Sequence, residues 1–294
     1  MSAQRPPAPR LLDPFRVLDP AQRSRHLAAY ERHLEQRDGA LDLPARTLSR
    51  REAHLEELAR KPVRWHGDFD AEGFNALFGG GKGSAPDMRT AWLVAAAEAN
   101  EGESYGVELE LRRFAQRHPD GRGAEVAYLH LLLQEHYHTR LLEVLCRTCG
   151  LDVRLQTPGL SQRAVIHFMM WLPERLRWIL VLCGEVVGCV VFEILREKSS
   201  LFAAQPEVEE RLRSLLGEIY HDEILHVAWL RARLHPRAIR VAHRIAPLVA
   251  AGVMREVPQF HALGCSRREF VFRLRRGLEI PPELDWLDRE SSRS

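Results

Sequence analysis

Two copies of the pattern Glu-x-x-His constrain this 294-residue chain more than any other feature. The first copy is Glu135 and His138, and the second is Glu223 and His226. Residues three apart stand on neighbouring turns of one helix face, and both pairs sit in apolar stripes, so we expect them to point into a helical core. Because an unpaired buried carboxylate costs several kcal/mol, each pair needs a compensating charge such as a metal ion.

The apolar stripes around the two pairs are regular. They comprise Leu131, Leu142 and Leu145 for the first pair, and Leu212, Leu216, Ile219, Val227, Leu230 and Leu234 for the second. One pair alone would be weak support, since the chain has 14 His. Two pairs in periodic stripes favour a shared site over the alternative, in which salt-bridged Glu and His fill an ordinary helical core.

Composition excludes little but narrows the class. A hydrophobic content of 45% is ample for a packed core, and a net charge of +2 is too small to indicate nucleic acid by itself. No amino-terminal signal segment is evident, so a cytoplasmic location is expected. The apolar stretch 178–195 resembles a membrane span, but Glu185 and Glu193 lie within it, which favours a core helix.

Helical periodicity and helix stop signals predict an all-α protein. Residues 1–19 are expected to form an extended arm, and two short covering helices follow at 20–37 and 44–61. The glycine run 79–84 lacks the residues of a phosphate-binding loop and is expected to be a linker. Long helices are predicted at 88–118, 123–149, 174–198 and 206–234, with a shorter one ending at 172. The organisation is thus an amino-terminal region 1–87, a bundle 88–234 and carboxy-terminal helices 235–294.

The two halves of the predicted bundle repeat one arrangement. A helix with an interior glutamate precedes each Glu-x-x-His helix, and these glutamates are Glu103 and Glu193. Four helices that each supply a Glu, two of them adding a His, form the ligand set of a carboxylate-bridged two-metal site. Four carboxylates would offset two divalent cations, so the filled site would be close to neutral.

These residues resemble the ferritin-like di-iron carboxylate superfamily, which includes rubrerythrins, aldehyde-deformylating oxygenases, small-subunit ribonucleotide reductases, multicomponent monooxygenases and arylamine N-oxygenases. The resemblance covers about residues 88–234 and implies a four-helix bundle with additional terminal helices. It implies six metal ligands, which are Glu103, Glu135, His138, Glu193, Glu223 and His226. Of these, Glu135 and Glu223 would bridge the two metal ions. Asp222 matches a carboxylate that accepts a hydrogen bond from a ligating His in several of these proteins.

Several neighbouring residues compete for these roles. Glu101 is an alternative to Glu103, although the apolar residues on the face of Glu103 favour the latter. Glu185 lies eight residues before Glu193, about 80° away around the helix, and is expected to be an outer acid behind the ligands. The remaining candidates beside the motifs are His221 and Tyr137.

The resemblance implies an O2-dependent di-iron oxygenase or oxidase that acts on a small, partly apolar molecule. Two iron ions are the expected cofactor, with manganese in place of one iron left open. Because no flavin or dinucleotide motif is visible, electrons would come from a separate ferredoxin or reductase. No membrane is expected, nucleic acid is disfavoured, and a homodimer is left open. The alternatives are ferritin-like iron storage or ferroxidase activity, and a di-iron tRNA hydroxylase for which the Arg-rich flanks would offer a phosphate-binding surface.

Overall fold

A computed structural model describes residues 10–42, 46–78, 87–117, 126–153 and 159–287. The glycine run 79–84 and the first nine residues of the expected arm lie outside these ranges. Within them the chain forms eleven α-helices, two short 3-10 helices, η1 (Ser199–Phe202) and η2 (Pro282–Leu284), and one two-stranded sheet. The all-α prediction is confirmed.

Four long helices form the centre of the molecule, and their bounds agree closely with the predicted ranges. They are α4 (Met88–Arg117), α5 (Val126–Thr148), α7 (Glu174–Lys198) and α8 (Pro206–Arg233). Helix α4 packs against α5, α7 packs against α8, and α5 packs against α8. Helix α8 starts where expected because Pro206 occupies its first turn, a position that does not need the missing backbone N–H.

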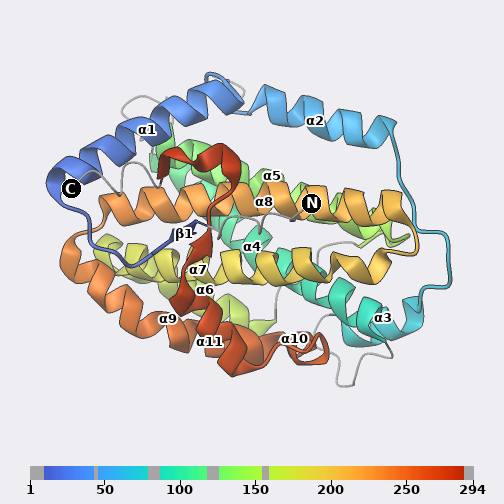
Figure 1. Cartoon of the computed structure of the whole chain (residues 1–294). Coiled ribbons are helices and arrows are strands. Elements are labelled where there is room, and N and C mark those ends of the chain that lie inside the picture. The colour runs from blue at the N-terminus through green and yellow to red at the C-terminus, as the bar shows by residue number, and fades with distance from the viewer. Residues whose placement is uncertain (1–9, 43–45, 79–86, 118–125, 154–158, 288–294) are drawn as a thin grey trace, which may run out of the picture.

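Three amino-terminal helices lie over this centre: α1 (Pro20–Asp38), α2 (Ser49–Arg60) and α3 (Ala71–Leu77). Helix α1 begins with a capping box between Asp19 and Gln22 and packs on α8, while α2 packs on α5 (Figure 1). The sequence predicted α1 and α2 as exposed coverings. Both also bury polar residues at their inner faces, Asp38 from α1 and Arg51 from α2. Helix α3 was not predicted.

The remaining helices follow the central ones in sequence or flank them. They are α6 (Leu160–Trp171), α9 (Pro236–Glu256), α10 (Gln259–Ala262) and α11 (Arg267–Arg276). Helix α9 packs on α7, and α11 packs on both α9 and α7. Figure 1 shows α9 and α11 on the side of the molecule opposite to α1 and α2.

A short antiparallel pairing joins the two ends of the described chain. Strand β1 (Leu11–Leu12) pairs with β2 (Leu278–Glu279), which follows α11. Gly277 precedes β2 with φ of 95°, and a Cβ there would lie 2.9 Å from the carbonyl oxygen of Leu12, so only glycine fits. One hydrophobic cluster extends from Leu12 to Leu287, so all three predicted regions contribute to the same core.

The apolar helix α7 is the only candidate membrane span among the described residues. The candidate segment, Glu174–Phe202, is long and apolar enough by length and composition, but 67% of its most apolar window is buried inside the protein. Its neighbours α8 and α9 account for that burial. The packing is therefore that of a core helix.

Candidate metal centre

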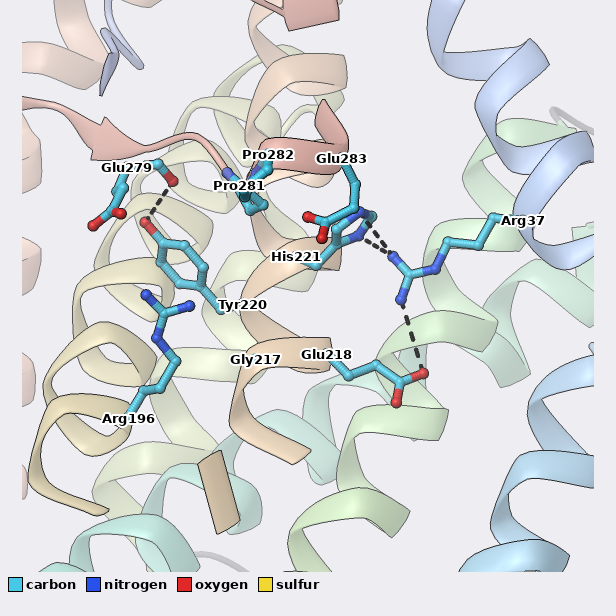
Figure 2. A pocket seen from close by; sticks show the side chains of 10 residues that line it. All are labelled: Arg37, Arg196, Gly217, Glu218, Tyr220, His221, Glu279, Pro281, Pro282 and Glu283. Carbon is cyan, nitrogen blue, oxygen red and sulfur yellow. Dashed lines mark hydrogen bonds and ion pairs between the residues drawn. The ribbon is translucent and has the colours of Figure 1, made fainter. Parts of the chain in front are cut away.

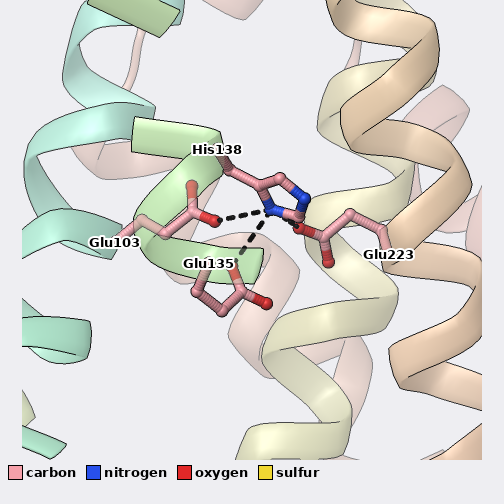
Figure 3. A group of neighbouring side chains, drawn as sticks. All are labelled: Glu103, Glu135, His138 and Glu223. Carbon is pink, nitrogen blue, oxygen red and sulfur yellow. Dashed lines mark hydrogen bonds and ion pairs between the residues drawn. The ribbon is translucent and has the colours of Figure 1, made fainter. Parts of the chain in front are cut away.

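Two groups of carboxylates and imidazoles meet between α4, α5, α7 and α8. The first group comprises Glu103, Glu135, His138 and Glu223, and the second comprises Glu135, Glu185, Glu223 and His226. In each group, one atom from every residue lies within 4.8 Å of the others. Figure 3 shows the side chains of the first group converging on Nδ1 of His138.

The two groups share Glu135 and Glu223, and each of these divides its two oxygens between the imidazoles. Oε2 of Glu135 lies 3.3 Å from Nδ1 of His138, and its Oε1 lies 2.7 Å from Nδ1 of His226. Oε1 of Glu223 lies 3.4 Å from Nδ1 of His138, and its Oε2 lies 4.0 Å from Nδ1 of His226. Carboxylates that bridge two metal ions need this division of their oxygens.

The far side of His138 is held by Asp222. Nε2 of His138 lies 3.1 Å from Oδ2 of Asp222. Burial alone would raise the pKa of Asp222, but Arg51 and Arg37 hold it well below its ordinary value. An ionised carboxylate can only accept, so Nε2 of His138 carries a proton and donates it, while Nδ1 faces the carboxylates of the cluster. The resemblance implied that Asp222 accepts a hydrogen bond from a ligating His, and the structure shows that His138 lies beside it.

The far side of His226 is held by Gln134, which the sequence analysis missed. The amide nitrogen of Gln134 donates to Oδ2 of Asp38 at 2.7 Å, so its Oε1 faces Nε2 of His226 at 3.0 Å. Nε2 of His226 therefore donates a proton, and its buried Nδ1 is directed at the carboxylates, 2.7 Å from Oε1 of Glu135. Gln134 directly precedes Glu135, just as Asp222 directly precedes Glu223. This repeat in the sequence could have indicated the role of Gln134.

Arg51 of α2 joins the two supports into one network. Its Nε donates to Asp38 at 2.7 Å, and another guanidinium nitrogen donates to Asp222 at 3.1 Å. Arg37 donates to the same oxygen of Asp222 at 2.7 Å. Hydrogen bonds from α1 and α2 thus reach the groups that orient both imidazoles. These contacts explain the buried polar residues on the inner faces of the two helices.

The cluster concentrates negative charge that needs compensation. Burial and the nearby Glu135 raise the pKa of Glu103 well above its ordinary value, and burial and Glu135 do the same to Glu223. Burial alone would lower the pKa of His226, but Glu135 and Glu185 raise it well above its ordinary value. The carboxylates therefore favour positive charge among them, supplied by protons or by cations. Four carboxylates and two inward-facing imidazoles fit two divalent metal ions.

The structure reverses the predicted roles of Glu185 and Glu193. Glu185 joins the second group, with its Oε2 at 3.4 Å from Nδ1 of His226. Glu193 is turned away and is bonded to Arg273, at 2.8 Å, and to Arg276 of α11. The predicted placement of Glu193 in the cluster was wrong. Helix α7 is apolar on nearly all sides, so its sequence does not fix which face meets the other helices.

The other candidates lie outside both groups. Glu103, not Glu101, is the α4 carboxylate that joins the cluster. The Tyr137 hydroxyl donates to Glu218 at 2.9 Å, and neither residue belongs to the two groups. His221 lies beside Arg37 in a surface pocket of about 450 Å³ (Figure 2), which is also lined by Tyr220, Glu218 and Glu279, among others.

Two carboxylates of the cluster are partly exposed. The histidine side chains are fully buried, whereas those of Glu103 on α4 and Glu185 on α7 are 19% and 13% exposed. On α7, a Cβ added at Gly188 would lie 3.6 Å from Oε2 of Glu223, so a residue with a longer side chain would crowd the bridging carboxylate.

Comparison with protein-family models, curated proteins and solved structures finds no match to this chain.

Proposed function

We propose that this protein is a ferritin-like di-iron protein that uses dioxygen to oxidise a small, partly apolar organic molecule. The single observation that carries the proposal is the division of oxygens by Glu135 and Glu223 between two imidazoles. Two divalent cations would be bridged by carboxylates that divide their oxygens in this way, and the donor set around them is that of a di-metal bundle.

The helices support the same assignment. Glutamates from α4 and α7, together with a Glu-x-x-His pair from α5 and another from α8, form the donor set of ferritin-like di-metal bundles. Under this proposal, one metal position is formed by Glu103 and His138 and the other by Glu185 and His226. Both positions share the bridging carboxylates.

The protein's own residues would hold, orient and shield the reacting groups. Ferrous ions in a site of hard oxygen and imidazole ligands would supply the electrons that reduce dioxygen. Asp222 and Gln134 orient the two imidazoles. Glu103 and Glu185, the two partly exposed carboxylates, would lie where dioxygen and an organic substrate approach.

Metal content tests the proposal. The protein would be expressed in iron-supplemented medium, analysed for metal per chain, reduced without oxygen and then exposed to O2 while its absorption is recorded. We expect about two irons per chain and a transient absorption change on exposure to O2. Folded protein without metal would mean that the Glu and His pairs are structural. Much more iron than two per chain would indicate storage instead.

A matched pair of variants on α5 provides the control. His138 is fully buried in the cluster, and His136, two residues earlier on the same helix, is exposed. His138→Ala should lower the bound iron to about one ion per chain, whereas His136→Ala should retain about two. Equal iron content in the two variants would contradict the assignment of His138.

A further inference from the structure

The two halves of the centre differ in the group behind each imidazole. His138 donates to the carboxylate of Asp222 at 3.1 Å, which Arg37 and Arg51 also contact, whereas His226 donates to the amide oxygen of Gln134 at 3.0 Å. Hydrogen bonds to a charged acceptor are stronger, and such an acceptor makes a ligating imidazole a better electron donor. His138 is therefore the stronger ligand of the two.

The carboxylate oxygens are also spaced differently around the two imidazoles. Those around Nδ1 of His138 lie within a narrow range of 3.3 to 3.7 Å. Those around Nδ1 of His226 range from 2.7 to 4.0 Å, and the longest distance is to Glu223. The first position is thus the more evenly enclosed, and less rearrangement is needed there to surround an ion.

The second position is less closed by its bridging carboxylate. Oε2 of Glu223, the oxygen on the side of His226, lies 4.0 Å from Nδ1 of that imidazole, and Gly188 of α7 adds no side chain there. A less closed position loses and exchanges its ion more easily than an enclosed one.

From these differences we infer that the two metal positions fill in a fixed order. The position of Glu103 and His138 binds a divalent cation first and tightly, and the position of Glu185 and His226 binds the second cation more weakly and exchanges it. The inference rests on the proposed function in requiring that the cluster bind metal. Asp222 and Gln134 act as positioning residues that set the order, and two different metals can be loaded in sequence.

Titration of the folded protein with Co²⁺, followed by calorimetry and by the visible absorption of the bound ion, tests the order. We expect two binding steps whose affinities differ by about 10- to 100-fold. His226→Ala should keep one ion with the affinity of the first step. His138→Ala should keep one ion with the affinity of the second step, and His136→Ala should keep both steps.

The positioning roles have their own readout. Asp222→Asn should weaken the first step by about 10-fold or more and leave the second nearly unchanged, whereas Gln134→Leu should weaken only the second. Circular dichroism would establish that each variant is folded. If Asp222→Asn does not fold, the comparison of His226→Ala with His138→Ala still tests the order of binding.

Either of two results would overturn the order: equal affinities in the unchanged protein, or loss of the tighter ion in His226→Ala. Absence of any Co²⁺ binding would overturn the metal centre itself, so the two failures are distinguishable.

Discussion

The amide nitrogen of Gln134 on α5 donates a 2.7 Å hydrogen bond to the carboxylate of Asp38 on α1, 96 residues away in the sequence. Asp38 thereby decides which end of the amide faces His226. Helix α1, which is not one of the four central helices, thus determines that Nε2 of His226 carries a proton. The amino-terminal helices belong to the site as well as to the fold.

The two acids of α7 should differ sharply in their effect on metal content. Glu185 lies in the cluster, and Glu193 is held by Arg273 and Arg276. We expect Glu185→Ala to lose at least one ion per chain, and Glu193→Ala to retain about two. Metal analysis of the two purified variants measures this. The opposite result would return Glu193 to the ligand set.

Substitutions at Gly188 should depend on size. A Cβ at this position would make ordinary contact with Glu223, at 3.6 and 3.9 Å, so Gly188→Ala should keep both metal ions. The larger side chain in Gly188→Leu would collide with the bridging carboxylate and should reduce metal content to about one ion per chain or less. Metal analysis combined with a thermal melt separates this effect from unfolding. Full occupancy in Gly188→Leu would contradict the close approach of α7.

Arg51 should contribute far more to stability than its neighbour Arg50. Arg51 is 5% exposed and pairs with Asp38, Glu218 and Asp222. Removing it leaves buried carboxylates without their partner, so Arg51→Ala should lower the free energy of unfolding by about 3 kcal/mol. Exposed Arg50 donates to two backbone carbonyls among the described residues, and Arg50→Ala should cost less than about 1 kcal/mol. Urea unfolding of both variants measures the difference.

Glu98 should make the protein less stable as the pH rises. Burial, with smaller effects of Glu101 and Glu256, raises the pKa of Glu98 from 4.5 to about 8. Between these values the unfolded chain ionises this carboxyl and the folded protein keeps it protonated, so stability present below pH 4.5 is lost as the pH approaches 8. Glu98→Gln should therefore raise the melting temperature at pH 8 and leave it nearly unchanged at pH 4.5. An equal shift at both pH values would show that the effect is not ionisation.

The sequence by itself determined the long helices and both Glu-x-x-His pairs. The apolar stripe that continues the face of Glu223 and His226 fixes which side of α8 is buried, and the same holds for Glu135 and His138 on α5. The expectation for Asp222 came from the resemblance to di-iron proteins, not from periodicity, because the neighbours of a helical ligand usually point elsewhere.

Only the tertiary structure decided which glutamate of α7 joins the cluster. We expected Glu193, but that helix is apolar on nearly every side, so its pattern does not fix the face, and the outcome depends on Arg273 and Arg276, which follow about 80 residues later. The roles of Asp38 and Arg51 were likewise beyond the sequence. Periodicity reports the faces of single helices, whereas these contacts depend on how distant helices pack against one another.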